Sequence, residues 1–412
     1  MAHETRSPER DTFLMAVERV RPVALAGAEE AEHSRTLPAA TVDALLEAGL
    51  FTVGAPRELG GAECDPLTQV EVFEAMSRID TSAGWCLLIG AMSTALAGGY
   101  LGDRAVARIF QGSWPISAGL ISPAGTAERV PGGYRVSGRW PFGSGIRHSS
   151  WVFTGAVVVA PGAPAEGPPP MINVAVPTKQ VTIEDTWHVS GLKGTGSCHY
   201  SMADVFVEDE FTCPFPLAPA RRGGPLFRLP LIALLTPAHV GFALGVARRA
   251  LDEIAAIAGS KQRLWSQAPL LRHGPFHMDL GRAQAKLTAA RALAFEALGS
   301  AWTTTLGGGA LSVEQWSSIR LAATYATEIA AEVTTVAYRH GGGGALYASS
   351  PLQRCFRDIH AAIQHVAATD DAYEFAGKAL LGIAEPHAMM TPRPEPLPRG
   401  RGSYYAASDV IA

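Results

Sequence analysis

The chain has 412 residues, of which 47% are apolar, enough to bury a sizeable core in about two or three packed units. Its formal net charge of −4 provides no electrostatic footprint for nucleic acid or an anionic membrane. The five cysteines are scattered and none forms a CxxC spacing, so we expect reduced thiols and no metal site. The polar N-terminus lacks the apolar run of a signal peptide, and we expect a cytoplasmic protein with no membrane partner.

The first quarter of the chain carries a helical pattern. Apolar residues recur at helical spacing in 40–51 and 67–80, and Gly49 is a suitable C-cap for the first of these segments. Residues 82–100 are nearly all apolar, as expected for a helix enclosed by others. We therefore predict an N-terminal helical domain over residues 1–113.

The middle of the chain changes character. It contains β-branched and aromatic segments separated by turn residues, namely 132–142, 151–159, 171–177 and 200–207. A Pro/Gly-rich insert at 161–170 reads as a surface loop between two of them. This pattern predicts a central antiparallel β domain over residues 114–224.

Helical patterning then returns, in alanine-rich segments such as 279–299 and 313–340. A further helix is expected over 353–371. We predict a C-terminal four-helix bundle over residues 225–390, followed by a Pro/Gly-rich tail at 391–412. Helices, then strands, then helices is an α+β arrangement, which argues against a dinucleotide-binding site built from alternating βαβ units.

Several motifs in this order resemble one known family. They are 59-LGGAECDP-66, 79-IDTSAGW-85, 132-GGYRVSGRWPFGSGIRHSSWVF-153, 187-WHVSGLKGTGS-197 and 350-SPLQRCFRDIHAAIQH-365. The chain resembles the acyl-CoA dehydrogenase fold over roughly residues 20–390, and in particular its oxygen-activating branch. That branch comprises the oxygenase components of two-component flavin-dependent monooxygenases.

A missing carboxylate separates the two branches. Acyl-CoA dehydrogenases need a carboxylate base, which in the family pattern lies shortly after an Arg-Asp pair like Arg357-Asp358. Here the matching place, 364–369, reads QHVAAT. The other known location is the apolar helix after the β domain, but the sequence has no Asp or Glu between Glu210 and Asp252. Both positions therefore lack a carboxylate, which argues against a thioester dehydrogenase.

The resemblance implies a different chemistry and assigns it to two residues. Reduced FMN or FAD, supplied by a separate flavin reductase, would react with O₂ to give a C4a-hydroperoxyflavin that hydroxylates an aromatic, possibly polycyclic, small molecule. Ser144 falls where the fold places a hydroxyl against flavin N5. His365 falls where these monooxygenases carry a histidine, whose ordinary pKa suits proton transfer near neutrality. We expect Ser144 and His365 to be the catalytic pair.

Further residues are carried over to binding roles. For the cofactor these are Phe142, Ser144, Thr195, Ser197, Arg263, Gly342, Gly343 and Arg357, with Arg272 as a rival to Arg263. For the substrate they are Ser93, His148 and His239. The helix around 85–100 lacks the histidine that some relatives use to hold the substrate and carries only Ser93 and Thr94 in its place. The resemblance also implies a homotetramer in which the last helices complete a neighbour's flavin site.

Three alternatives stay open from the sequence. The same chemistry could oxygenate the nitrogen of an amino substrate. The protein could be a flavin oxidase or dehydrogenase that acts on a non-thioester substrate, with His365 as the base. It could also be a non-catalytic scaffold of the same fold. His360 lies five residues before His365, about 140° around a helix, so the two could not chelate one metal ion. FMN and FAD are not distinguished.

Overall fold

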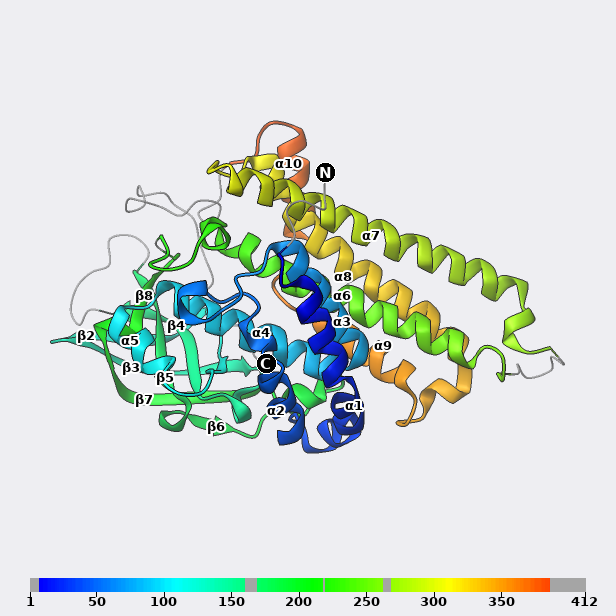
Figure 1. The fold of residues 1–412 in the computed structure, drawn as a ribbon, viewed down its shortest axis with the longest axis horizontal. Coiled ribbons are helices and arrows are strands. Elements are labelled where there is room, and N and C mark those ends of the chain that lie inside the picture. Colours follow the sequence, from blue (N-terminus) through cyan, green and yellow to red (C-terminus); the bar gives the residue numbers. More distant parts are fainter. Residues whose placement is uncertain (1–6, 160–168, 218, 262–267, 386–412) are drawn as a thin grey trace.

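The computed structural model describes residues 7–159, 169–217, 219–261 and 268–385. A sheet lies at one end of the molecule and long C-terminal helices extend from the other, with α3 (Pro66–Ile79) and α4 (Thr81–Tyr100) between them (Figure 1). The predicted order of helices, sheet and helices is confirmed. The chain therefore brings three units together around α4.

The N-terminal unit is helical, as predicted. Its remaining helices are α1 (Arg10–Ser34), α2 (Ala39–Glu47) and α5 (Asp103–Ile109). Helix α3 starts at an N-cap, where the Asp65 carboxylate accepts hydrogen bonds from the backbone N–H groups of Leu67 (2.9 Å) and Thr68 (3.0 Å), followed by proline at the first helical position. Ser7 closes the same cap, donating its backbone N–H to Asp65 at 2.6 Å.

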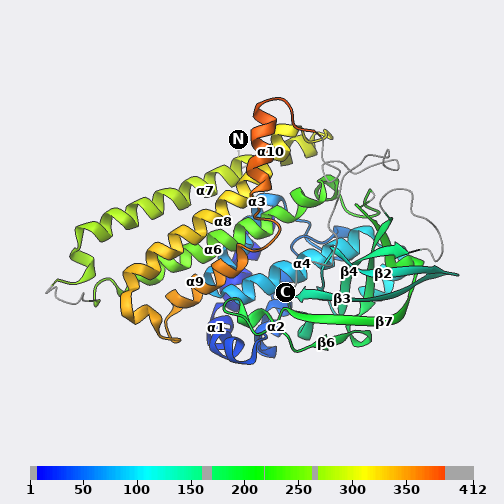
Figure 2. The same ribbon diagram turned by 180° about the vertical axis from the view of Figure 1, so that it is seen from behind.

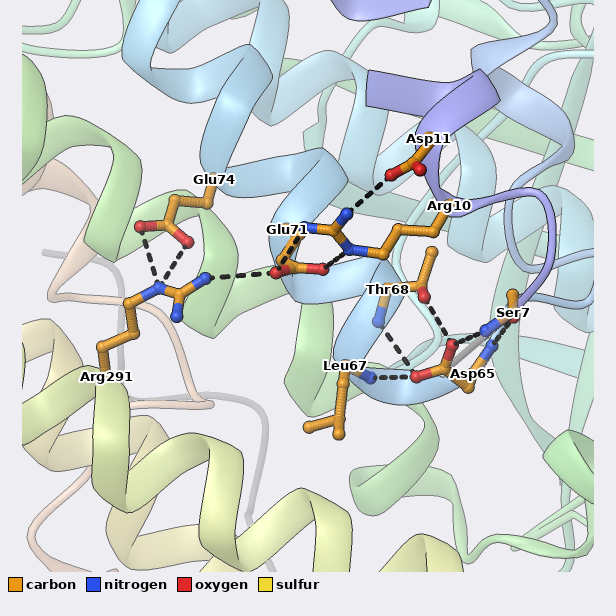
Figure 3. A network of polar contacts seen from close by, with 9 residues as sticks. All are labelled: Ser7, Arg10, Asp11, Asp65, Leu67, Thr68, Glu71, Glu74 and Arg291. Carbon is orange, nitrogen blue, oxygen red and sulfur yellow. Dashed lines mark hydrogen bonds and ion pairs between the residues drawn. The ribbon is translucent and has the colours of Figure 1, made fainter. Parts of the chain in front are cut away.

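A chain of ion pairs joins this unit to the C-terminal helices (Figure 3). Arg10 of α1 binds Glu71 of α3 at 2.5 Å, and Arg291 of α7 (Gly274–Leu306) binds Glu74 of α3 at 2.9 Å. Glu71 also lies 3.5 Å from Arg291, so one carboxylate is shared by two arginines from distant segments. Because both carboxylates are largely shielded from water, these pairs are screened less than exposed ones.

The sheet is mixed rather than wholly antiparallel, which corrects the sequence prediction. Its strands are β1 (Ser117–Ala118), β2 (Pro123–Val130), β3 (Gly133–Gly143), β4 (Trp151–Val159), β5 (Met171–Pro177), β6 (Thr182–Glu184), β7 (Cys198–Glu208) and β8 (Thr212–Phe215), in the order β6-β7-β3-β2-β4-β5-β8 with β1 beside β4. Strands β1 and β2 pair with β4 in parallel. After the β2–β3 hairpin the chain crosses to the far side of β2, and β4 therefore runs in the same direction as β2.

One strand pair matters directly for the site. Gly143 at the end of β3 lies opposite Cys198 at the start of β7. The segment that leaves β3 and the segment that enters β7 are therefore neighbours. Ser144 and Ser197 belong to these two segments and are brought together by the register of the sheet.

The C-terminal unit consists of α6 (Leu231–Ile257), α7, α8 (Val313–Gly341), α9 (Pro351–Ala362) and α10 (Asp371–Leu380). Helices α4 and α6 are long and apolar enough to cross a membrane, but 94% and 78% of their most apolar windows are buried inside the fold. Figure 2 shows α4 between α6 and the strands. Contact with neighbouring elements accounts for their apolar composition.

Helix α9 is shorter than the sequence predicted. The sequence predicted a continuous helix over 353–371, but α9 ends at Ala362. Beyond this end the backbone hydrogen bonds span three residues instead of four, as in the bond from the His365 N–H to the Ala362 carbonyl (3.0 Å). The His365 ring then accepts the N–H of Ala367 at its Nδ1 (3.2 Å), which takes this donor away from a helical ladder. His365 therefore lies in a turn.

The Asp358 carboxylate joins the three units. It is fully buried and accepts hydrogen bonds from the Thr81 hydroxyl at the start of α4 and from the Leu192 backbone N–H (2.6 Å) in the segment before β7. Close packing accompanies this contact, because a Cβ on Gly191 would lie 2.0 Å from the Arg357 carbonyl oxygen. Burial raises the pKa of the Asp358 carboxyl to about 6.

We predict that Asp358→Ala lowers the free energy of unfolding by about 3 kcal/mol, because two buried donors lose their acceptor. Asp358→Asn should lose less than about half of that, since its amide oxygen can still accept from Leu192 and the raised pKa shows that a neutral group suits this position. Chemical denaturation of both variants measures the difference. Equal losses in the two variants would contradict this role for the carboxylate.

Candidate active site

Trp85, near the start of α4, lies at the centre of a cluster drawn from all three units. Its indole Nε1 donates to the Ser144 hydroxyl at 3.1 Å. Its ring packs edge-on against Phe242 (centroids 4.9 Å apart), His365 (5.6 Å) and His239 (6.0 Å). None of these four neighbours carries a carboxylate, in keeping with the two empty base positions in the sequence.

A row of hydroxyl groups leads away from Trp85. Ser144 Oγ lies 2.8 Å from Ser197 Oγ, which lies 2.7 Å from Thr195 Oγ1, and Thr195 Oγ1 donates to the Leu192 carbonyl at 2.8 Å. Ser197 and Thr195 are buried, and Ser144 is 6% exposed. Three of the predicted cofactor residues are thus brought together, but Thr195 lies two hydrogen bonds behind Ser144.

Two histidines form a stacked pair beside the indole. The rings of His239 on α6 and His365 lie 4.3 Å apart and within 29° of parallel. His239 Nδ1 faces the Leu235 carbonyl at 3.3 Å and must donate to it, so its Nε2 carries a lone pair. His365 Nδ1 accepts from Ala367, so the Nε2 of the neutral ring carries the hydrogen. The pair therefore presents one acceptor and one donor.

Both imidazoles are held neutral at physiological pH. Burial lowers the pKa of His239 to about 4, and burial together with the neighbouring His239 lowers the pKa of His365 well below its ordinary value. His239 Nε2 is buried and has no hydrogen-bond partner among the residues that the structure describes. An acceptor without a partner is costly, which points to a donor that arrives with a ligand.

His148 lies in the loop that also carries Ser144. Burial lowers its pKa to about 4, and neither ring nitrogen is hydrogen-bonded within the described part of the chain. Gly145 has a φ of +71°, and a Cβ there would lie 2.7 Å from His148 Nε2. Glycine is thus required both by the backbone conformation and by the imidazole that covers it.

Two further predicted residues, Ser93 and Phe142, differ in their exposure. Ser93 is buried on α4, eight residues beyond Trp85. Phe142 is 57% exposed and has a φ of +62°, a strained conformation for a residue with a side chain. This exposed aromatic ring, near the end of β3, is available to a ligand or a partner.

Arg357 and the glycines lie apart from the Trp85 cluster. The Arg357 guanidinium binds Glu32 (2.7 Å), Gln353 (2.6 Å) and the Ser190 carbonyl, so these protein groups already occupy it. Gly342 and Gly343 lie at the end of α8 away from the sheet (Figure 1).

Three further residues complete the sequence predictions. Arg272 ends a short 3-10 helix at 270–272, and Arg263 lies outside the described residues. His360 contacts Thr335 (3.2 Å) and Phe356 rather than the cluster.

Sequence reasoning missed two members of the cluster. Trp85 stood in the motif 79–85 and in the apolar segment 82–100 but was given no role, although an indole with a polar N–H near a helix start is a signal for a buried hydrogen bond. Phe242 follows His239 by three residues and so shares its helix face, a spacing that was available from the sequence.

Comparison with known proteins identifies the family. Residues 7–102 match the acyl-CoA dehydrogenase N-terminal domain, and residues 238–370 match the acyl-CoA dehydrogenase C-terminal domain. The chain belongs to the acyl-CoA dehydrogenase family.

Its relatives define the branch. The chain is 34% identical over 366 residues to indole-3-acetate monooxygenase of Pseudomonas putida, covering 86% of this chain and 89% of the relative. It is 28% identical to the oxygenase component of FADH(2)-dependent resorcinol hydroxylase of a Rhizobium species, covering 93% and 98%. The structure of XiaF from a Streptomyces species in complex with FADH2 and glycerol superposes with a TM-score of 0.84 at 28% identity, covering 90% and 96%. The chain is thus a flavin-dependent monooxygenase.

We predict that the neutral His239 makes the protein sensitive to acid. Its folded-state pKa of about 4 lies below the ordinary 6.5, so the unfolded chain binds more protons between these values and stability falls as the pH drops through that window. At pH 5 this loss is on the order of 2 kcal/mol. His239→Phe should therefore lose less stability between pH 7 and pH 5 than the wild type, measured by denaturant unfolding at both values.

Phe242→Leu is the matched control, because it alters packing on the same indole without removing a titratable group. It should keep the pH dependence of the wild type. If His239→Phe and wild type lose stability in parallel, the imidazole is not held neutral by the fold.

Proposed function

We propose that this chain is the oxygenase component of a two-component system that hydroxylates an aromatic small molecule bearing a ring N–H or O–H. The observation that carries this proposal is the cluster around Trp85, where a hydroxyl and two neutral imidazoles meet without a carboxylate. A thioester dehydrogenase needs the missing base. The relatives that act on indole-3-acetate and resorcinol support the substrate class.

The residues present fit a reduced flavin. Ser144 lies just after β3 and is 6% exposed, and Phe142, two residues earlier, offers an exposed ring. We infer that Ser144 contacts a nitrogen of the flavin ring and that Ser197 and Thr195 support it from behind. When bound, reduced flavin supplies the activation of O₂. The apolar faces of α4 and α6 exclude water from that reaction.

The histidine pair suits the proposed substrate. A phenol hydroxyl or an indole N–H donates to His239 Nε2, which is otherwise without a partner. His365 Nε2–H donates a hydrogen bond either to an oxygen of the substrate or to the oxygen atom that the substrate receives. Withdrawal of the substrate hydrogen toward His239 increases the electron density of the ring, which favours attack on an electrophilic oxygen.

The wider setting is also proposed. We infer a separate flavin reductase as partner, a cytoplasmic location and a homotetramer. Gly342 and Gly343 follow directly on α8, whose C-terminal end points away from the sheet (Figure 1), and we infer that they meet the cofactor of a neighbouring subunit.

The test uses a matched pair of substrates. The purified protein is supplied with flavin, NADH and a general flavin reductase, and offered indole-3-acetate or its N-methyl analogue. We predict an oxygenated product from the first and at least about tenfold less from the second, because methylation removes the hydrogen bond to His239. His239→Phe should lose this discrimination.

Hydrogen peroxide without product from any phenol or indole would contradict the proposal. Protein purified with tightly bound oxidised flavin, and turning over an amine or alcohol without incorporating oxygen, would favour the oxidase. Oxygen found on nitrogen in the product would identify an N-oxygenase.

A further inference from the structure

We propose that the Leu192 carbonyl fixes the direction of the hydroxyl row so that Ser144 can only accept a hydrogen bond from the cofactor, and that the site thereby selects reduced over oxidised flavin. Thr195 is the positioning residue that transmits this direction. The inference rests on the proposed function, because it takes the ligand beside Ser144 to be the flavin ring.

The direction follows from the last member of the row. A carbonyl oxygen cannot donate, so in this 2.8 Å contact the Thr195 hydroxyl donates its one hydrogen to Leu192 O. Thr195 Oγ1 can then only accept from Ser197, and Ser197 Oγ can only accept from Ser144. Each hydroxyl has a single hydrogen, and the orientation therefore propagates back along the row to Ser144.

The opposite end of the row agrees with this orientation. The Trp85 indole N–H is a donor only, so Ser144 Oγ accepts from it at 3.1 Å. Ser144 thus accepts once and donates once within the protein, and one lone pair on its oxygen remains. It has no hydrogen left to offer a ligand.

The terminal carbonyl is itself held in place. Leu192 O also accepts the Trp187 indole N–H at 2.9 Å and the Thr195 backbone N–H at 3.2 Å, and the Leu192 N–H is bound to Asp358 at 2.6 Å. The residue adopts a left-handed conformation (φ 54°, ψ 33°) and is buried, as is Thr195. Water therefore has little access with which to offer Thr195 another acceptor. The 2.8 Å between Thr195 Oγ1 and Leu192 O requires a hydrogen between the two oxygens, and only the hydroxyl can supply it.

The two redox states of flavin differ in the group that such an acceptor recognises. Reduced flavin carries a hydrogen on N5, whereas oxidised flavin carries a bare lone pair there. An oxygen that can only accept binds the first and repels the second. One hydrogen bond gained or lost corresponds to about a tenfold change in affinity. The row therefore raises the affinity for reduced flavin, which a reductase delivers, relative to that for the oxidised flavin left after the reaction.

The experiment compares dissociation constants for oxidised flavin and, anaerobically, for reduced flavin, by fluorescence or absorbance titration. Wild-type protein should bind reduced flavin at least about tenfold more tightly. In Thr195→Val the row loses its anchor, Ser144 becomes free to donate, and oxidised flavin should gain affinity until the ratio shrinks about tenfold. Thr195→Ser keeps the hydroxyl and should keep the wild-type ratio.

A second variant separates direction from packing. Trp85→Phe removes the donor at the other end but leaves the orientation set by Leu192, so the redox preference should persist even if both affinities fall. The inference is overturned if Thr195→Val lowers the affinity for reduced and oxidised flavin by the same factor, or in any other way leaves the ratio of the two dissociation constants unchanged. Wild-type protein that binds both forms equally overturns it while leaving the proposed function standing. Wild-type protein that binds neither form overturns both.

Discussion

The buried carboxylate of Asp358 is the contact on which the arrangement of the site depends. It holds the start of α4 through Thr81 and the segment before β7 through the Leu192 N–H. The same Leu192 residue presents its carbonyl to Thr195, at the end of the hydroxyl row that reaches Ser144. One side chain on α9 thus fixes the three units relative to one another. It also fixes the Leu192 carbonyl, which sets the direction of the hydrogen bonds along the hydroxyl row. A buried carboxylate with a raised pKa is costly, and this double task explains why the fold tolerates it.

The chemistry of the branch follows from what surrounds Trp85. Dehydrogenation of a thioester requires a carboxylate that is charged in the resting enzyme, whereas here burial keeps two imidazoles neutral, and His239 further lowers the pKa of His365. Neutral rings supply a donor and an acceptor without bringing a charge or its hydration shell among the buried side chains of the cluster. The same fold therefore serves a different reaction after a change of a few side chains on α6 and after α9.

Much of the fold was predictable from patterning. The apolar run at 82–100 marked a helix enclosed by others, and α4 is that helix. The motif around Ser144 and the GTGS turn brought Ser144, Thr195 and Ser197 into one hypothesis, and the register of β3 with β7 explains why they meet. The parallel pairing of β2 with β4 was missed because it depends on where a crossing loop passes, which residue patterns do not encode. The end of α9 was missed because a side-chain acceptor, His365 Nδ1, competes with the helix. The role of Leu192 lies in its backbone, and no residue type signals it.

The most direct test of this account is a crystal structure of the protein with reduced flavin introduced anaerobically. The account predicts a flavin ring beside Trp85 with one ring nitrogen within hydrogen-bond distance of Ser144 Oγ, and with the His239–His365 pair facing the space where a substrate would lie. A flavin ring bound elsewhere, or a Ser144 hydroxyl turned away from Ser197 to donate to the cofactor, would contradict it.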